Sequence, residues 1–135
     1  MAIERECFVE PWEEEVFVQT LEWTPFSFFV AMADVRIRGF VVGCLENTGS
    51  AVYGHVSNLG VTAAYRGTGL GRLLVTRLER QFIIDGAGGA LLEVRVSNTD
   101  AQEFYRRLGY REAFLLSGYY SNGEDALVMM KEMPL

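Results

Sequence analysis

The sequence predicts an α/β fold of the α+β type, in which helices cover one mixed, mostly antiparallel sheet. Three observations support this prediction. β-rich segments dominate residues 27–61, helical patterns alternate with strands after residue 70, and no linker or repeat interrupts the chain. A chain of 135 residues with 50% hydrophobic residues can bury a core without disulfides or metals. Residues 1–135 are therefore expected to form a single domain.

The N-terminal segment carries apolar residues at roughly the spacing of short amphipathic helices: Phe8, Trp12, Val16, Phe17 and Leu21. Two short helices are expected there, with Pro11 at the entry to the second. Three β-rich segments follow, SFFVAMADV, GFVVGCLEN and SAVYGHVSNLGV. They are expected to form an antiparallel meander.

The second half of the chain alternates between helical and strand patterns. Apolar residues recur every fourth position at Leu70, Leu74, Leu78 and Phe82, which predicts a helix that stops near Gly86. ALLEVRVS is expected to be a strand, NTDAQEFYRRLG a capped helix, and YREAFLLSGYY and EDALVMMKEM two further strands. A helix between two consecutive strands implies a crossover, so one parallel pair is expected within the sheet.

Composition narrows the classes of function. A net charge of −6 is the reverse of the basic character of nucleic-acid binders, and it permits cationic partners. No apolar run approaches the ~20 residues of a membrane-spanning helix, and no secretory leader is recognisable. With only Cys7 and Cys44 and no CxxC motif, reduced thiols in a cytoplasmic protein are expected. His55 is the only histidine, so no metal site is predicted.

The glycine-rich stretch RGTGLGR links an expected strand to an expected helix. At such a junction, unpaired backbone N–H groups and the positive end of the helix dipole favour an anion. Gly67, Gly69 and Gly71 lack the Cβ atoms that would keep a pyrophosphate from the backbone, while Arg66 and Arg72 add positive charge. An anion cradle is one interpretation, and a glycine-rich turn that only begins a core helix is the other.

Two nucleotide-binding motifs compare poorly with this loop. RGTGLGRLL has no lysine for a Walker loop, which argues against nucleotide hydrolysis. The glycines of GTGLGR fall at every second position, unlike the GxGxxG of dinucleotide-binding folds, although Glu93 lies about where a ribose-binding acid is expected. The chain is also short for a doubly wound sheet, so a dinucleotide binder remains only a competing hypothesis.

RGTGLG resembles the Q/R-x-x-G-x-G/A signature of the GNAT superfamily of N-acetyltransferases. The segments CFVEPWEEEVF, LLEVRVSNTDAQEFYRRLGY and GYYSNGEDALVMM are similar to RimI-type ribosomal-protein-alanine N-acetyltransferases. The resemblance implies helices on both faces of the sheet, a splayed parallel pair at the cofactor loop, and acetyl-CoA as cosubstrate. It also implies that the family's first strand is absent, because the chain opens at AIEREC, which matches the middle of the family's first helix.

Acetyl transfer to an amine needs a proton acceptor for the amine and a proton donor for the departing thiolate. Strand alternation puts Glu93 on a polar face of ALLEVRVS, and a solvated polar face is the structural alternative. The resemblance implies that Glu93 is the general base and Tyr105 the general acid. A neutral phenol can donate at pH 7, whereas packing in the core is the alternative for Tyr105.

The resemblance also implies the residues that hold the cofactor. They are Leu59 and Val61 on a bulged strand, Arg66, Gly67, Thr68, Gly69, Leu70, Gly71 and Arg72 in the loop, and Asn98 and Tyr105 after it. Gly60 makes a bulge easy at this position, and Asn98 has the residue type and position of a helix N-cap.

Four residues of the C-terminal hairpin are candidates for the substrate groove: Tyr119 and Tyr120, with Glu124 and Asp125 beside them. Hairpin packing and turn polarity are their structural alternatives. His55 is interpreted as a packing or surface residue. Cys44 is interpreted as a small buried hydrophobic residue rather than a nucleophile.

The sequence therefore predicts an N-acetyltransferase that uses acetyl-CoA without a metal and acts as a monomer or a homodimer. The expected acceptor is the N-terminal alanine of a basic ribosomal protein. No nucleic-acid or membrane partner is expected. An acetyltransferase for a polyamine, amino acid or aminoglycoside is the first alternative, and a non-catalytic acetyl-CoA-binding module is the second.

Overall fold

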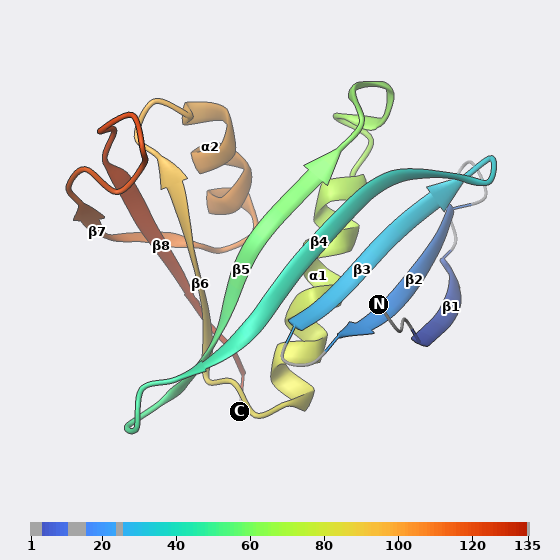
Figure 1. The fold of residues 1–135 in the computed structure, drawn as a ribbon, viewed down its shortest axis with the longest axis horizontal. Coiled ribbons are helices and arrows are strands. Elements are labelled where there is room, and N and C mark those ends of the chain that lie inside the picture. Colours follow the sequence, from blue (N-terminus) through green and yellow to red (C-terminus); the bar gives the residue numbers. More distant parts are fainter. Residues whose placement is uncertain (1–3, 11–15, 24–25, 135) are drawn as a thin grey trace.

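The computed structural model describes residues 4–10, 16–23 and 26–134, with side chains described for residues 27–134. Within these residues the sheet has eight strands in the order β1-β2-β3-β4-β5-β6-β8-β7 (Figure 1). They are β1 (Glu4–Glu10), β2 (Val16–Trp23), β3 (Phe26–Ala33), β4 (Arg36–Asn47), β5 (Val52–Val61), β6 (Gly89–Arg95), β7 (Arg111–Leu116) and β8 (Ala126–Glu132). The 3₁₀ helix η1 (Ala63–Tyr65) and the helices α1 (Leu70–Ile84) and α2 (Thr99–Arg107) complete the fold.

The pairing of the strands confirms the predicted mixed sheet. β5 and β6 are parallel, and every other pair of neighbouring described strands is antiparallel. The predicted meander is formed by β3, β4 and β5. The predicted crossover is β5-α1-β6, because α1 lies between two neighbouring parallel strands.

The N-terminal prediction of two helices is wrong for the described residues. Phe8 lies in β1, and Val16, Phe17 and Leu21 lie in β2, while Pro11 and Trp12 fall outside the described residues. β2 pairs with β3 from Phe26 to Met32, and β1 pairs with β2. Without β1 and β2, β3 would be the edge strand of the sheet, and its outer backbone N–H and C=O groups would have no strand to pair with. The spacing of apolar residues within a segment does not reveal this long-range pairing. The predicted lack of a first strand is corrected as well, because β1 forms this edge of the sheet.

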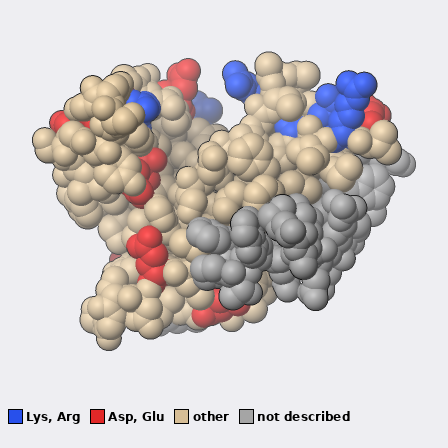
Figure 2. Space-filling view, viewed as in Figure 1, with Lys and Arg blue, Asp and Glu red and all other residues tan. Residues whose placement is uncertain are grey.

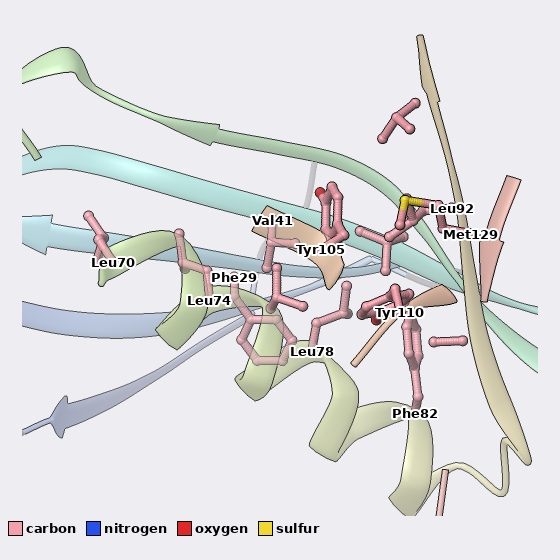
Figure 3. Close-up of a cluster of buried hydrophobic side chains, with 14 of the residues drawn as sticks. Phe29, Val41, Leu70, Leu74, Leu78, Phe82, Leu92, Tyr105, Tyr110 and Met129 are labelled. Carbon is pink, nitrogen blue, oxygen red and sulfur yellow. The ribbon is translucent and has the colours of Figure 1, made fainter. Parts of the chain in front are cut away.

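Helix α1 has the buried face that its four-residue spacing predicts. Leu70, Leu74, Leu78 and Phe82 are each at most 1% exposed, and they pack against β3, β4 and β5 (Figure 3). Phe29 of β3 and Val41 of β4, both fully buried, belong to the same cluster. The prediction for this helix is confirmed.

Both described helices lie on the same face of the sheet, which differs from the predicted helices on both faces. Tyr105 of α2 belongs to the buried cluster that holds the α1 residues, and the Phe104 ring lies beside Gly71 of α1. The topology explains this arrangement. β5, β6 and β7 run parallel and progress in one direction across the sheet, so two right-handed crossovers place both helices on one face.

Close contact between α1 and the sheet predicts that Gly54→Ala destabilises the protein by about 1–3 kcal/mol. A Cβ at Gly54 would lie 2.1 Å from Cδ2 of Phe82, which is 1% exposed and has little room to move. Chemical denaturation measures the effect. Gly88→Ala is the matched control, because its new Cβ would meet nothing nearer than the Val52 carbonyl oxygen at 4.0 Å. Equal stability of the two variants would contradict the prediction.

Candidate active site

A cleft opens where β5 and β6 separate. The two strands pair only from Tyr53 to His55, opposite Gly89 to Leu91, and then diverge (Figure 1). Beyond His55, β5 has no described neighbour on its β6 side, so its backbone groups there are available to a ligand. A cavity of about 270 Å³ lies between the strands. It is lined by Val56, Ser57, Asn58, Leu59, Leu92, Glu93, Val94, Arg95, Asn98, Ala101, Tyr105 and Tyr120.

A second cavity, of about 760 Å³, lies between the end of β5, the glycine loop and α2. It is lined by Leu59, Gly60, Val61, Tyr65, Arg66, Gly67, Gly69, Gly71, Arg72, Asn98, Asp100, Ala101, Phe104, Arg107 and Leu108. Three arginines and one aspartate contribute the charges of this lining, which favours an anion. Figure 2 shows a hollow at the upper edge of the molecule with Lys and Arg on both sides of it.

The glycine loop leaves the start of α1 open to a ligand. Gly69 is the N-cap of α1 in the left-handed conformation, with φ of 90°, and no side chain caps the helix. The first amides of the helix are therefore available to an anion, which the dipole of a 15-residue helix also favours. Gly71 admits the Phe104 ring, since a Cβ at Gly71 would lie 3.2 Å from Phe104 Cζ. This geometry fits the phosphate groups of a coenzyme.

Three of the residues predicted to hold the cofactor, Thr68, Leu70 and Tyr105, do not line this cavity, and Tyr105 lines the smaller one instead. The Thr68 hydroxyl donates a hydrogen bond to the Tyr65 carbonyl and closes the loop. The Leu70 side chain is fully buried in the core, so only its backbone N–H is left for a ligand. Leu59, Val61, Arg66, Gly67, Gly69, Gly71, Arg72 and Asn98 do line the cavity.

The bulge in β5 lies nearer the centre of the strand than predicted. Val42 pairs with Asn58 while Gly43 pairs with Val56, so Ser57 is the extra residue. Gly60 instead pairs in register with Phe40, and a Cβ at Gly60 would lie 2.4 Å from Phe40 Cε1. This glycine makes room for an aromatic ring, and the bulge that bends β5 falls in the wall of the smaller cavity.

Glu93 belongs to a network of hydrogen bonds at the rim of the cleft. His55 Nε2 lies 2.7 Å from Glu93 Oε2, and the Tyr119 hydroxyl donates to Glu93 Oε1 at 2.9 Å. On its other side, His55 Nδ1 lies 3.1 Å from Glu46 Oε1. The Glu93 side chain is 13% exposed and that of Glu46 is 48% exposed. The network therefore leads from the interior of the cleft to solvent.

Charge pairing shifts the titration of this network. The hydrogen bond from His55 lowers the pKa of Glu93, against the opposing effect of burial. The bond to Glu93 raises the pKa of His55, with a smaller contribution from Glu46, and burial again opposes the shift. The charged forms stabilise each other, so Glu93 is ionised at neutral pH and can accept a hydrogen bond or a proton from a bound amine.

Tyr105 lines the same cleft as Glu93. It is 8% exposed, and its hydroxyl has no hydrogen-bond partner among the described residues. Burial raises the pKa of Tyr105 to about 12, so the phenol keeps its proton at neutral pH. In Figure 3 its oxygen lies at the end of the ring remote from the labelled side chains of α1. A buried phenol that keeps its proton, and whose hydroxyl has no partner among the described residues, can donate that proton to a thiolate as the thiolate forms.

Asn98 connects the two cavities. Its side chain accepts a hydrogen bond from the Ala101 N–H at 3.1 Å, which confirms the predicted N-cap of α2. Leu59, Asn98 and Ala101 line both cavities. A coenzyme with its phosphates at α1 can therefore direct a thioester toward Glu93 and Tyr105.

The C-terminal hairpin closes one side of the cleft. The Arg95 guanidinium lies 4.0 Å from the centre of the Tyr120 ring, which lines the smaller cavity. Glu124 accepts hydrogen bonds from Arg95 and from the Ser97 N–H, while Asp125 accepts one from the Gly118 N–H. Tyr119 and Tyr120 thus lie at the cleft, whereas Glu124 and Asp125 hold the hairpin in shape.

Sequence reasoning missed His55 and Glu46 as members of this network. Glu46 and His55 lie on adjacent strands, and β5 brings His55 beside Glu93 of β6. No local motif marks these residues, so only the strand register could have revealed them. For α2 the sequence did contain a usable pattern. Asp100 and Phe104 of α2 and its C-cap Leu108 follow one another at every fourth position, and all three line the larger cavity.

Residues 1–110 match the model of the Acetyltransferase (GNAT) family. The chain is 39% identical to an uncharacterized N-acetyltransferase of Methanocaldococcus jannaschii, over 98% of this chain and 83% of that protein. It is 33% identical to an N-alpha-acetyltransferase of Sulfurisphaera tokodaii (94% and 81% covered). It is 31% identical to a putative [ribosomal protein bS18]-alanine N-acetyltransferase of Bacillus subtilis (94% and 83% covered).

The solved structure of nourseothricin acetyltransferase is similar, with a TM-score of 0.76 and 26% identity over 98% of this chain and 85% of that one. No helix in the described part of the chain is long and apolar enough to cross a membrane. The family model covers most of the chain, and the phosphate-binding geometry at α1 fits the coenzyme that this family uses. The chain belongs to the GNAT family and is an acetyl-CoA-dependent N-acetyltransferase.

Proposed function

We propose that this enzyme acetylates the α-amino group at the N-terminus of a polypeptide, by direct transfer from acetyl-CoA. The observation that supports the proposal best is the common cleft of Glu93 and Tyr105, which joins the larger cavity through Leu59, Asn98 and Ala101. Relatives at 33% and 31% identity are an N-alpha-acetyltransferase and a putative alanine N-acetyltransferase for a ribosomal protein.

Each step of the proposed reaction has a group in the cleft. The neutral amine attacks the thioester carbonyl carbon, and Glu93 accepts the proton that the nitrogen loses. Backbone N–H groups of β5, with Val61 as the candidate, polarise the thioester carbonyl oxygen. As the tetrahedral intermediate collapses, the carbon–sulfur bond breaks and Tyr105 donates its proton to the thiolate. The products are the acetylated amine and coenzyme A.

The Glu93 network gives the amine's proton a route to solvent. His55 Nε2 lies against Glu93, and His55 Nδ1 lies against the exposed Glu46. Although the charged ring is favoured beside Glu93, His55 can relay a proton whenever it is neutral with its proton on Nδ1: it then accepts a proton at Nε2 and releases the Nδ1 proton toward Glu46. Tyr119 holds Glu93 from the opposite side, which keeps the carboxylate directed into the cleft.

Amine chemistry favours an α-amino group over a lysine side chain. The α-amino group has a reference pKa of about 7.7 to 8.0, whereas that of lysine is about 10.4. Near neutral pH a useful fraction of the α-amine is therefore already unprotonated, but almost none of the lysine amine. A site with one carboxylate base can therefore complete the deprotonation of an α-amino group more easily than that of a lysine side chain.

We infer further that the preferred acceptor is an alanine-led N-terminus of a basic protein, such as a ribosomal protein. The net charge of −6 suits a cationic partner. The relative from Bacillus subtilis is a putative alanine N-acetyltransferase for a ribosomal protein. The second candidate acceptor is a small-molecule amine. Its support is the structural similarity to nourseothricin acetyltransferase, a TM-score of 0.76 over 98% of this chain.

Acetyl-CoA and coenzyme A are each expected to raise the thermal stability of the protein, whereas NAD and ATP leave it unchanged. A ligand at about 100 times its Kd contributes roughly 2.7 kcal/mol to the free energy of unfolding. Differential scanning fluorimetry measures this effect. Arg66→Ala is expected to weaken binding, since Arg66 lines the larger cavity, while Arg111→Ala, outside that cavity, leaves binding intact. Stabilisation by NAD alone would contradict the assignment of the cavity.

An acceptor panel separates the two candidate substrates. Acetylation of alanine-led peptides, at a higher kcat/KM than polyamines, free amino acids or aminoglycosides, would support the proposal. The N-terminal position is checked by mass spectrometry of the product, with an N-formylated peptide as the blocked control. Faster turnover of a small amine would favour the second candidate, and cofactor binding with no turnover would favour a non-catalytic module.

A further inference from the structure

Three side chains with metal-ligating atoms meet on the face of the sheet that carries Glu93. Cys44, Glu46 and His55 each offer one such atom, a thiol sulfur, a carboxylate oxygen or a ring nitrogen. These atoms all lie within 4.8 Å of one another. We propose that Cys44, Glu46 and His55 bind a thiophilic divalent cation, of which Zn²⁺ is the type.

The strand register brings the three residues together. Cys44 of β4 lies directly opposite His55 of β5, and Glu46 is two residues further along β4, on the same face as Cys44. Such cross-strand and i, i+2 neighbours are held by the backbone ladder. The three ligand atoms therefore need only side-chain rotations to converge on one ion.

The orientation of His55 matches that of a metal ligand with a supporting carboxylate. Its Nε2 lies 2.7 Å from Glu93, which leaves Nδ1 directed toward Glu46 at 3.1 Å. Histidines that bind a metal through one nitrogen commonly donate the other N–H to a carboxylate, which fixes the tautomer and the orientation of the ring. Glu93 is placed to play that supporting part.

The ligand set selects the class of cation. Sulfur, nitrogen and oxygen donors together suit Zn²⁺, whereas Mg²⁺ and Ca²⁺ prefer oxygen donors alone. Three protein ligands leave a fourth position for water. Binding replaces the proton on Cys44 Sγ and the proton on His55 Nδ1, and both protons pass to the buffer.

Access from solvent is available on this face. The Glu46 side chain is 48% exposed and that of His55 is 20% exposed, while Cys44 is half-buried with a free thiol. Two carboxylates, Glu46 and Glu93, flank the imidazole and favour a cation beside it. An ion can therefore reach the three ligands from the surface.

A cation bound by Cys44, Glu46 and His55 would also affect catalysis, and this second expectation rests on the proposed function. A cation on His55 Nδ1 blocks the route by which a proton passes from Glu93 through the ring to Glu46. Zn²⁺ is therefore expected to inhibit acetyl transfer. Binding of the ion does not depend on that mechanism and is measured separately.

The test uses the full chain without a purification tag, with its thiols kept reduced by a phosphine. Binding is expected at one ion per chain in titrations of Zn²⁺ against a chromogenic chelator. Co²⁺ is expected to give the near-ultraviolet charge-transfer absorption of a cobalt–thiolate bond. Cys44→Ser removes that absorption and weakens Zn²⁺ binding at least about tenfold, and Glu93→Gln weakens it about tenfold through the lost carboxylate. Cys7→Ser is the matched control and binds as the wild type does.

Glu46→Gln gives a second test that does not disturb the thiol. It too weakens Zn²⁺ binding but keeps the cobalt–thiolate absorption. In acetyl-transfer assays, Cys44→Ser keeps its metal-free rate and loses sensitivity to Zn²⁺. Binding that is absent, or equal in wild type and Cys44→Ser, would overturn the site. Zn²⁺ binding without inhibition of acetyl transfer would support the metal site and contradict only the expected block of the proton route.

Discussion

Glu93→Gln is expected to slow acetyl transfer by at least about 10²-fold, with acetyl-CoA binding retained. The amide keeps the size of the side chain and can still accept a hydrogen bond from His55, but it cannot take a proton from the amine. The cofactor cavity does not include Glu93, so the variant should be stabilised by acetyl-CoA as the wild type is. Steady-state kinetics with an alanine-led peptide, together with a thermal shift, measure the two quantities.

Glu112→Gln is the matched control for this variant. Glu112 lies on β7, outside both cavities at the active site, and its exposed carboxylate pairs with Arg106. The same change of charge there should leave kcat and KM unaltered. A Glu93→Gln enzyme with the wild-type rate would remove Glu93 from the mechanism, whereas loss of acetyl-CoA binding would indicate a structural role.

Tyr105→Phe is expected to lower kcat by about 10²-fold with little change in stability. The Tyr105 hydroxyl has no hydrogen-bond partner among the described residues, so its removal leaves no described donor or acceptor unpaired. Coenzyme A must then leave as a thiolate without a proton from the enzyme. The assay follows release of the free thiol, and chemical denaturation reports the free energy of unfolding.

Tyr110→Phe provides the opposite pattern as a control. The Tyr110 hydroxyl donates to Glu79 Oε2 at 2.8 Å in the core, and Glu79 is 8% exposed. Loss of this bond is expected to cost about 1–3 kcal/mol of stability, while kcat per folded molecule is unchanged because Tyr110 does not line the cleft. If Tyr105→Phe behaves as Tyr110→Phe does, Tyr105 is a packing residue and the thiolate has another proton donor.

Strong local patterns predicted the second half of the chain well. Four apolar residues from Leu70 to Phe82 gave the buried face of α1, and Asn98 caps α2. The glycine loop could be assigned to the start of a helix because its chemistry is contiguous in the sequence. The same approach gave the wrong element for the N-terminal segment. The apolar positions Phe17 and Leu21 fit a strand that pairs with β3 as well as they fit a helix, and Phe8 fits a strand that pairs with β2.

The sequence by itself therefore determined the helices after residue 70, the crossover between parallel strands, and the residue types at the anion cradle. The tertiary structure decided which side chains share a site. It moved the bulge to Ser57, placed both described helices on one face, and joined Glu46, His55 and Glu93 across three strands. The physical reason is that helices and loops follow from neighbours in the chain. Strand pairing and register depend instead on long-range contacts that no local pattern encodes.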